Sequence, residues 1–342
     1  MIKNNFKIFD RVINKNSPTL IIAEIGINHM GDEDLCKEMI LSALDSGADC
    51  VKLQTINEEE SYLPNTESYK VFKGTQLSLQ AIKKLKNIAE DNNGFLFSTP
   101  GDISSLRLLK KANLQAYKVS SGLFTNIPLI QEIIKYNEPI ILSTGMAKEE
   151  EIERVMSLMK REGITNIALL HCISLYPAPY SSLNLSYISK ISEKYNVITG
   201  YSDHSEGEIA CLTAVSMGAK IIEKHFTIDN SIKGADNRTS MEANAFKNMC
   251  KNIRNIEKML YLSDEKPHHK ELELRNSRYR MLVAKRDLQS GEKLTLENVN
   301  FMRGSGDAHK FIMAYDWDQI KGKTCISNLK KNTLITLDLL RD

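Results

Sequence analysis

The sequence predicts an α/β protein: a (β/α)8 TIM barrel followed by a small β-rich domain. Eight short apolar runs precede residue 230, and segments with helical spacing of apolar residues separate them. The runs are Leu20–Ile25, Cys50–Thr55, Phe95–Thr99, Ala116–Ser120, Pro139–Thr144, Ile167–Cys172, Val197–Asp203 and Lys220–Phe226. Most are almost continuously apolar, as parallel strands are when both of their faces are covered. Eight strand–helix repeats are the pattern of a TIM barrel.

The remaining segments set the predicted domain boundaries. Residues 1–262 form the barrel, in which residues 1–19 act as an N-terminal cap. The connection over residues 56–94 is too long for one helix, so we expect a loop near Tyr62–Gly74 before its helix. The stretch 263–279 has the polar composition of a linker and includes His268 and His269. Residues 280–342 form the small domain, which is near the lower size limit for independent folding and should lean on a partner.

The composition argues against several classes of protein. The chain has 342 residues and a net charge of +2, so no overall field draws it to nucleic acid or to a membrane surface. No apolar run reaches the length of a membrane span, and the N-terminus lacks the apolar core of a signal peptide. The six cysteines contain no CxxC pair and are typical of free thiols in a reducing compartment. We therefore expect a cytoplasmic protein.

Polar residues gather at the ends of the predicted strands, where TIM barrels place their chemistry. Side chains two apart on a strand share a face. The anion-binding candidates are Lys52 and Gln54 after the second run, Thr99 after the third, Lys118 and Ser121 after the fourth, Ser143 after the fifth, and Ser202 after the seventh. Two lysines among several hydroxyls suit a phosphate group. Taken singly, each residue could equally be a surface lysine or part of a turn.

Two histidines predict a metal site. His204 and His225 end consecutive runs, and imidazole is a common ligand of borderline divalent metals. Two imidazoles do not close a structural zinc site, so open positions would suit Mn²⁺, Mg²⁺ or Co²⁺ as a Lewis acid. Glu24 and Glu223 could orient a water or the histidines, or else form salt bridges with Lys52 or Lys224.

Motifs along nearly the whole chain resemble those of the bacterial sialic acid synthases, which include the N-acetylneuraminate, legionaminate and pseudaminate synthases. The motifs are Glu24-Ile25-Gly26-Ile27-Asn28-His29, Lys52-Leu53-Gln54-Thr55, Tyr117-Lys118-Val119-Ser120-Ser121-Gly122, Leu142-Ser143-Thr144-Gly145-Met146, Tyr176-Pro177-Ala178-Pro179-Tyr180, Ser202-Asp203-His204 and Glu223-Lys224-His225-Phe226. The run from Ala284 to Glu292 resembles part of the family's antifreeze-like (SAF) domain.

The resemblance implies an activity and a set of roles. Members of this family condense phosphoenolpyruvate with an N-acylated amino sugar, which gives a nine-carbon 2-keto-3-deoxy acid and phosphate. They use a divalent metal, for which we expect Mn²⁺ before Mg²⁺ or Co²⁺. They act as domain-swapped homodimers. The resemblance implies that phosphoenolpyruvate is held by Lys52, Thr99, Lys118, Ser121, Ser143 and Ser202. It implies that His204 and His225 hold the metal and that Glu24 sits beside the catalytic water. Tyr176 and Asp236 would face the sugar, and Arg303 would reach into the partner's barrel.

Four positions depart from the family pattern. Leu123 stands where a glutamate is frequent, Gly101 where phenylalanine is usual, Gly304 where proline is usual, and Ser174 where neuraminate synthases often have asparagine. The phosphate and metal sets are intact, so the departures concern the sugar and not the reaction. N-acetylmannosamine and a 2,4-diacetamido-trideoxyhexose both remain as acceptors. The run from Tyr176 to Tyr180 favours the neuraminate/legionaminate branch, with the pseudaminate branch as the alternative.

Two other readings compete with a synthase. A lysine Schiff-base aldolase would use Lys118 or Lys52 with pyruvate and would release no phosphate. A non-catalytic scaffold is the second alternative, since a fold does not dictate a function. Cys172 is either a thiol nucleophile or a small buried apolar residue. Chelator-sensitive release of phosphate would separate a synthase from both alternatives.

Overall fold

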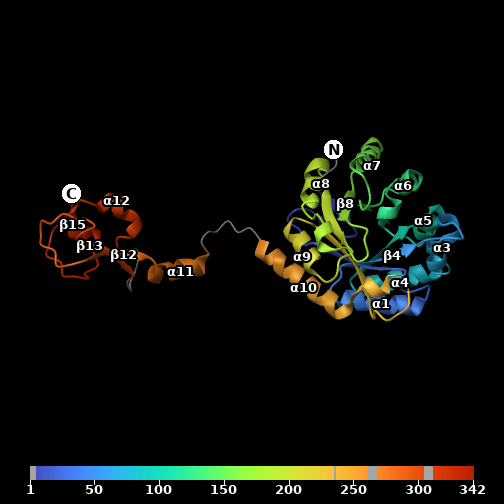
Figure 1. Ribbon diagram of the computed structural model, residues 1–342, viewed down its shortest axis with the longest axis horizontal. Helices are drawn as coiled ribbons and strands as arrows, with labels where there is room; N and C mark the ends of the chain where they lie inside the picture. Colours follow the sequence, from blue (N-terminus) through green and yellow to red (C-terminus); the bar gives the residue numbers. More distant parts are fainter. Residues whose placement is uncertain (1–4, 235, 261–267, 304–310) are drawn as a thin grey trace. The chain divides into compact units, whose positions relative to one another are not determined.

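The computed structural model describes residues 5–234, 236–260, 268–303 and 311–342 (Figure 1). The chain divides into two compact units, Met1–Tyr261 and Leu262–Asp342, and each is described by itself. Within the described ranges, no helix combines the length and apolar character needed to cross a membrane.

The first unit is a closed barrel of eight parallel strands, which confirms the predicted fold. The strands are β3 (Leu20–Gly26), β4 (Cys50–Thr55), β5 (Phe95–Pro100), β6 (Tyr117–Val119), β7 (Ile140–Ser143), β8 (Ile167–Cys172), β9 (Ile198–Asp203) and β10 (Ile221–Thr227). They pair in chain order, and β10 closes the ring by pairing with both β9 and β3. A two-residue strand, β11 (Met241–Glu242), pairs in parallel with the end of β10. The predicted runs match these strands to within a residue or so at each end.

Helices surround the barrel. They are α1 (Glu33–Asp45), α4 (Leu79–Asp91), α5 (Ile103–Lys111), α6 (Ile127–Ile134), α7 (Glu149–Arg161), α8 (Tyr187–Tyr195), α9 (Ile209–Ser216) and α10 (Ala243–Leu260). Several begin at a side chain that accepts hydrogen bonds from the first-turn N–H groups, among them Asp32, Ser78 and Asp102. The stretch Tyr62–Gly74, predicted as a loop, contains a short helix, α3 (Glu67–Phe72), and another short helix, α2 (Glu58–Ser61), precedes it.

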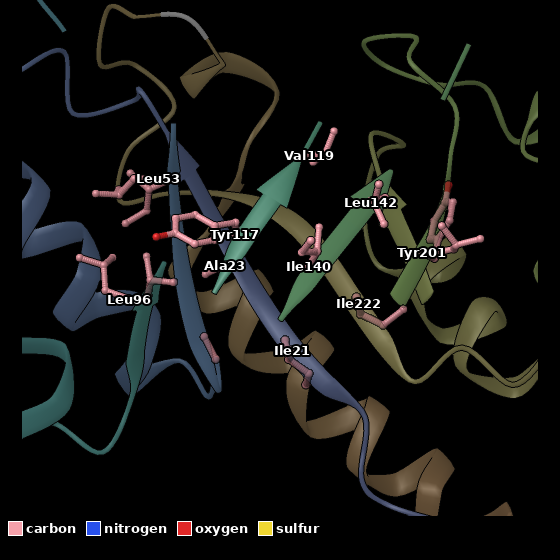
Figure 2. Close-up of a cluster of buried hydrophobic side chains, with 14 of the residues drawn as sticks. Ile21, Ala23, Leu53, Leu96, Tyr117, Val119, Ile140, Leu142, Tyr201 and Ile222 are labelled. Atoms are coloured by element: carbon pink, nitrogen blue, oxygen red, sulfur yellow. The ribbon is translucent and has the colours of Figure 1, made fainter. Parts of the chain in front are cut away.

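The two faces of each strand bury different apolar clusters. Alternate residues, such as Ile21, Tyr117, Ile140 and Ile222, point outward to an outer cluster under the helices, part of which Figure 2 shows. The other face supplies an inner cluster within the barrel: Leu20, Ile22, Cys50, Phe97, Ala116, Ile141, Ala168, Leu170, Ile198 and Ile221, joined by Phe6, Ile8 and Ile13. The barrel is therefore a packed core and not a pore.

A hairpin at the N-terminus completes the inner cluster. Strands β1 (Phe6–Ile8) and β2 (Arg11–Ile13) pair antiparallel. Phe6 and Ile8 are fully buried, and the ring of Phe9 stacks on that of Phe95 with centroids 4.3 Å apart. Phe95 begins β5, so the hairpin packs at the N-terminal ends of the strands. This packing leaves the opposite end of the barrel as the open one.

The second unit is a small β-rich domain, as predicted. Its longest ladder pairs β12 (Arg280–Ala284) antiparallel with β13 (Val299–Arg303), and a shorter one pairs β14 (Thr324–Cys325) with β15 (Leu340–Arg341). Its own core includes Leu282, Leu294, Ile320 and Ile335, with a short helix α12 (Trp317–Ile320). The segment assigned to the linker contains a helix, α11 (His269–Arg278), which begins at His268.

Candidate active site

Above the inner cluster, the same strand faces turn from apolar to polar. On β10, Ile221 is followed at two-residue steps by Glu223 and His225, and on β3, Ile22 is followed by Glu24. A cavity of 210 Å³, here called the mouth cavity, lies at this level. It is lined by Glu24, Lys52, Gln54, Lys118, Ser120, Ser121, Gly122, Ser143, Cys172, Tyr176, Ser202, His204, Glu223, His225 and Asp236. Strand periodicity thus brings residues from all parts of the barrel sequence to one place.

Two buried lysines and two buried glutamates form the floor of the mouth cavity. Lys52 Nζ lies 2.8 Å from Glu24 Oε2 and 3.8 Å from Glu223 Oε2, and Lys118 Nζ lies 3.3 Å from Glu223 Oε1. All four side chains are nearly inaccessible to solvent. The cluster is balanced in charge, so an anion entering here meets lysines that are already partnered by carboxylates.

The pKa values of this cluster reflect burial set against ion pairing. Burial would lower the pKa of Lys52, but Glu223 and Glu24 raise it above its ordinary value. For Lys118 burial prevails over Glu223, and its pKa is lowered. Burial would raise the pKa of Glu223, yet Lys118 and Lys52 hold it well below its usual range. Glu223 is therefore a carboxylate at neutral pH.

Hydroxyl groups surround the charged cluster. Lys52 Nζ donates to Thr99 Oγ1 at 3.2 Å, and Ser202 Oγ donates to Glu223 Oε1 at 2.8 Å. The Ser143 hydroxyl is buried and has no hydrogen-bond partner within the described protein. A buried donor without a partner is costly, so a ligand oxygen in the mouth cavity would satisfy it.

A glycine sets the shape of the wall next to Ser143. The N–H of Gly145 donates to Ser121 Oγ at 3.1 Å. A Cβ at Gly145 would lie 2.5 Å from Ser174 Oγ and 2.6 Å from Ser121 Oγ. Only glycine lets these two hydroxyls approach the turn after β7. Ser174 therefore stands beside the cavity without lining it.

The two histidines lie side by side, with ring centroids 5.3 Å apart. His204 Nδ1 donates to the Ile173 carbonyl at 2.9 Å, which leaves Nε2 as an acceptor, and the Tyr176 hydroxyl donates to it at 2.9 Å. His225 Nδ1 is buried without a hydrogen bond and lies 3.6 Å from Asp236 Oδ2. Burial lowers the pKa of His225, although Asp236 opposes the shift.

This pair fits a divalent metal held by two neutral imidazoles. Both side chains line the mouth cavity; His204 Nε2 accepts from the Tyr176 hydroxyl, and His225 Nδ1 is buried without a hydrogen-bond partner. Among the residues that the structure describes, no group of three or more His, Cys, Asp or Glu side chains is placed to hold a metal. The remaining coordination positions would belong to water or substrate, as in a catalytic site and unlike a closed structural one. Mn²⁺, Mg²⁺ and Co²⁺ stay the metals predicted from the sequence for these two ligands.

A second buried ion pair supports the strand ends that carry the histidines. Lys224 Nζ lies 2.7 Å from Asp203 Oδ2 and also donates to the Ser205 carbonyl. Asp203 Oδ1 accepts from the Tyr201 hydroxyl at 3.0 Å and from the Ser205 N–H at 2.8 Å. These contacts tie β9 to β10 immediately beside His204 and His225.

Most residues that the sequence singled out come together. Glu24, Lys52, Gln54, Lys118, Ser121, Ser143, Tyr176, Ser202, His204, His225 and Asp236 line the mouth cavity, and Thr99 contacts Lys52. Arg303 is exposed on β13 of the second unit. Gly304 lies outside the described residues.

The structure shows the contacts of the two glutamates that the sequence named as orienting or salt-bridging residues. Glu223 sits between the two lysines, on the same strand face as His225. Glu24 does form a salt bridge with Lys52, whereas Lys224 pairs with Asp203 and not with a glutamate. The cysteines of the described chain are free and buried, and Cys172 Sγ lies 3.7 Å from His204 Nδ1.

Comparison with known proteins places the chain in a family. The NeuB family model matches residues 39–265, and the SAF domain model matches residues 279–341. An uncharacterized protein of Methanocaldococcus jannaschii is 40% identical over 90% of this chain and 91% of its own length. The N,N'-diacetyllegionaminic acid synthase of Campylobacter jejuni is 37% identical over 93% of this chain and 98% of its own length. The crystal structure of an N-acetylneuraminic acid synthetase from Leptospira borgpetersenii superposes with a TM-score of 0.75 at 34% identity, over 81% of this chain and 98% of that one. The chain therefore belongs to the NeuB family of nonulosonic acid synthases and carries a SAF domain after its barrel.

Proposed function

We propose that this protein condenses phosphoenolpyruvate with the open-chain aldehyde of an N-acylated amino sugar. The products are a nine-carbon 2-keto-3-deoxy acid and phosphate. The acceptor is N-acetylmannosamine or a 2,4-diacetamido-trideoxyhexose, and the pseudaminate branch would use the same chemistry. One observation carries the proposal: two buried lysines and two adjacent imidazoles converge on one cavity at the carboxyl ends of the strands.

Phosphoenolpyruvate is held by the charged floor of the mouth cavity. Lys52 and Lys118 supply positive charge, and the hydroxyls supply directed hydrogen bonds to its carboxylate and phosphate oxygens. The unpartnered hydroxyl of Ser143 supports this role. Thr99, Ser121 and Ser202 complete the set. Because the lysines are fixed by Glu24 and Glu223 before substrate arrives, little reorganisation is needed when charge develops on the departing phosphate.

His204 and His225 would hold the divalent metal, for which we propose Mn²⁺, with Mg²⁺ and Co²⁺ as alternatives. When bound, the metal supplies Lewis-acid polarisation of the sugar's aldehyde. The chain contributes the orientation of the two rings. The Ile173 carbonyl fixes the tautomer of His204, and Asp236 stands next to the free nitrogen of His225.

Glu24 has the contacts of a base that positions water. Gln54 Nε2 donates to Glu24 Oε1 at 2.9 Å, and Lys52 Nζ lies 2.8 Å from Glu24 Oε2, so both contacts orient the carboxylate. C3 of phosphoenolpyruvate bonds to the aldehyde carbon, whose oxygen becomes an alkoxide, and C2 becomes cationic. Water adds to C2 and gives a proton to Glu24, which passes it on to the alkoxide. The C2–O bond to phosphate then breaks, and the proton of the new C2 hydroxyl leaves with the phosphate as the keto group forms.

The sugar is proposed to contact residues that lie beside the two histidines. The Tyr176 hydroxyl bonds to His204, and Asp236 lies close to His225. Ser174 lies next to Gly145. Arg303 would be supplied by the second unit of a partner subunit in a domain-swapped homodimer. We place the reaction in the cytoplasm, where phosphoenolpyruvate is available and the free thiols stay reduced.

The test is release of phosphate by purified protein given phosphoenolpyruvate and each N-acyl amino sugar, with mass analysis of the product. We expect a nine-carbon keto acid, loss of activity with chelator and recovery with Mn²⁺. A Schiff-base aldolase would instead use pyruvate, be trapped by borohydride, ignore chelator and release no phosphate. A scaffold would turn over no combination. Either result would refute the proposal.

A further inference from the structure

A second cavity adjoins the mouth cavity. This side cavity has a volume of 470 Å³ and shares the lining residues Gln54, Ser120 and Gly122 with the mouth cavity, so the two lie next to each other. The mouth cavity, at 210 Å³, is smaller than the ~300 Å³ at the low end for small-molecule sites. A six-carbon acceptor that reacts beside phosphoenolpyruvate must therefore extend beyond it.

The side cavity has an apolar wall. Ile56, Ile103, Leu123 and Leu129 line it, and Ile56 is nearly buried. Gly101 keeps this wall in place, because a Cβ there would lie 2.5 Å from Ile56 Cγ1 and would displace that side chain. Such a wall suits a methyl group better than a hydroxyl group, which would lose its hydrogen bonds to water there.

The side cavity differs from the mouth cavity in the charge of its described lining residues. None of its described lining residues is lysine, arginine or histidine, and two, Glu60 and Asp102, are acidic. Helices α5 and α6 begin here, and helix N-termini attract anions. Both are already capped, however: Asp102 accepts from Ser105 N–H and Asn126 from Leu129 N–H, while a proline in the first turn of α6 removes one donor. A phosphate would therefore meet no cationic side chain among these lining residues, and it would lie near two acidic ones.

Neutral polar groups complete the lining. The side-chain nitrogen of Gln54 is engaged with Glu24, which leaves its amide oxygen as an acceptor at the junction of the two cavities. Tyr62 adds a hydroxyl group at the far side. An amide substituent on the sugar could bond to such groups and place its methyl on the apolar wall.

We infer that the side cavity receives the end of the acceptor remote from its aldehyde, and that this end is uncharged, deoxygenated and N-acylated. The inference rests on the proposed function and narrows it to one class of acceptor. It excludes an acceptor phosphorylated at C6. It makes Leu123 and Gly101 determinants of specificity through the wall that they form.

A third cavity is the alternative place for the remote end of the acceptor. It measures 650 Å³ and includes Tyr176 in its lining. Its charged lining residues are Arg238, Glu206, Glu242 and Lys224, of which Lys224 is paired with Asp203. Arg238 is therefore the cation that an anionic end of the acceptor would meet in this third cavity, whereas the described lining of the side cavity contains no cationic side chain.

The experiment compares kcat/KM for three acceptors: 2,4-diacetamido-2,4,6-trideoxymannose, N-acetylmannosamine and N-acetylmannosamine 6-phosphate. We expect the first to exceed the second by at least about tenfold, the discrimination that apolar contacts of one or two groups provide, and the phosphate to be the poorest. Leu123→Lys should lower kcat/KM for the trideoxy sugar and raise it for the phosphate. Leu260→Lys, which adds the same charge at the exposed end of α10, should leave the order unchanged.

The outcomes separate the two proposals. If no acceptor yields a nine-carbon product, the proposed function is wrong. If products form but the 6-phosphate or N-acetylmannosamine is preferred by the wild-type protein, the inference alone is overturned. Loss of that phosphate preference in Arg238→Ala would then assign the third cavity. The wild-type order of acceptors decides the matter even if Leu123→Lys fails to fold.

Discussion

Replacing Lys224 by methionine tests how the barrel mouth is held together. Lys224 and Asp203 are almost completely buried, with exposures of 2% and 1%. Methionine keeps the approximate volume and length but removes the ion pair and the bond to the Ser205 carbonyl. Asp203 then keeps only neutral donors in a site closed to water. Removing one partner of a buried pair costs about 3–5 kcal/mol, because the other charge is left uncompensated.

The assay is denaturant unfolding of Lys224→Met, Asp203→Asn and the double variant. Lys224→Met should lose about 3–5 kcal/mol of unfolding free energy. The double variant, with no charge left, should recover about 1–3 kcal/mol relative to the sum of the single changes. Turnover should fall with Lys224→Met even where the protein is folded, because His204 and His225 stand on the two strand ends that the pair joins. A loss under about 1 kcal/mol, or strict additivity in the cycle, would refute the reasoning.

Three further outcomes are expected. Burial lowers the pKa of His29 from 6.5 to about 4. Between these two pH values His29 is therefore protonated in the unfolded chain but neutral in the folded one. The free energy of unfolding should fall by about 3 kcal/mol as the pH drops from 6.5 to about 4. In His29→Gln the free energy of unfolding should fall less over the same pH range. Equal slopes of unfolding free energy against pH in the two proteins would contradict the assignment. His204→Ala should reduce phosphate release by at least about a thousandfold while calorimetry still detects binding of phosphoenolpyruvate; a near-normal rate would rule out its metal role. Arg303→Ala should raise KM for the amino sugar more than KM for phosphoenolpyruvate, and a change confined to the latter would exclude its proposed role.

The barrel could be predicted because its strands carry two signals at once. Continuous apolar runs mark the strands, and two-residue periodicity marks which side chains face inward. Lys52 and Lys118 could be assigned to one cavity on that basis alone. What the pattern could not supply is pairing across the barrel: Glu223 and Lys118 are 105 residues apart and stand on strands that are not neighbours.

Short or polar elements escaped prediction for a different reason. Strands β1 and β2 have three residues each, too few to show an alternation. Helix α11 is largely polar and exposed in its described side chains, so it lacks the apolar stripe by which a helix is recognised. The side cavity was equally hidden, since its wall combines Ile56, Ile103 and Leu123 from three separate connections.

The hairpin that fills the inner cluster has a consequence for biosynthesis. Phe6 and Ile8 leave the ribosome about two hundred residues before Ile198 and Ile221, which belong to the same cluster. At ~5–20 residues per second the nascent chain keeps two large apolar side chains without their final neighbours for roughly ten to forty seconds. A truncated chain released before β10 is made would leave the same apolar surface uncovered and prone to aggregate. The hairpin formed by β1 and β2 can therefore reach its final packing only after the last barrel strand has been synthesised.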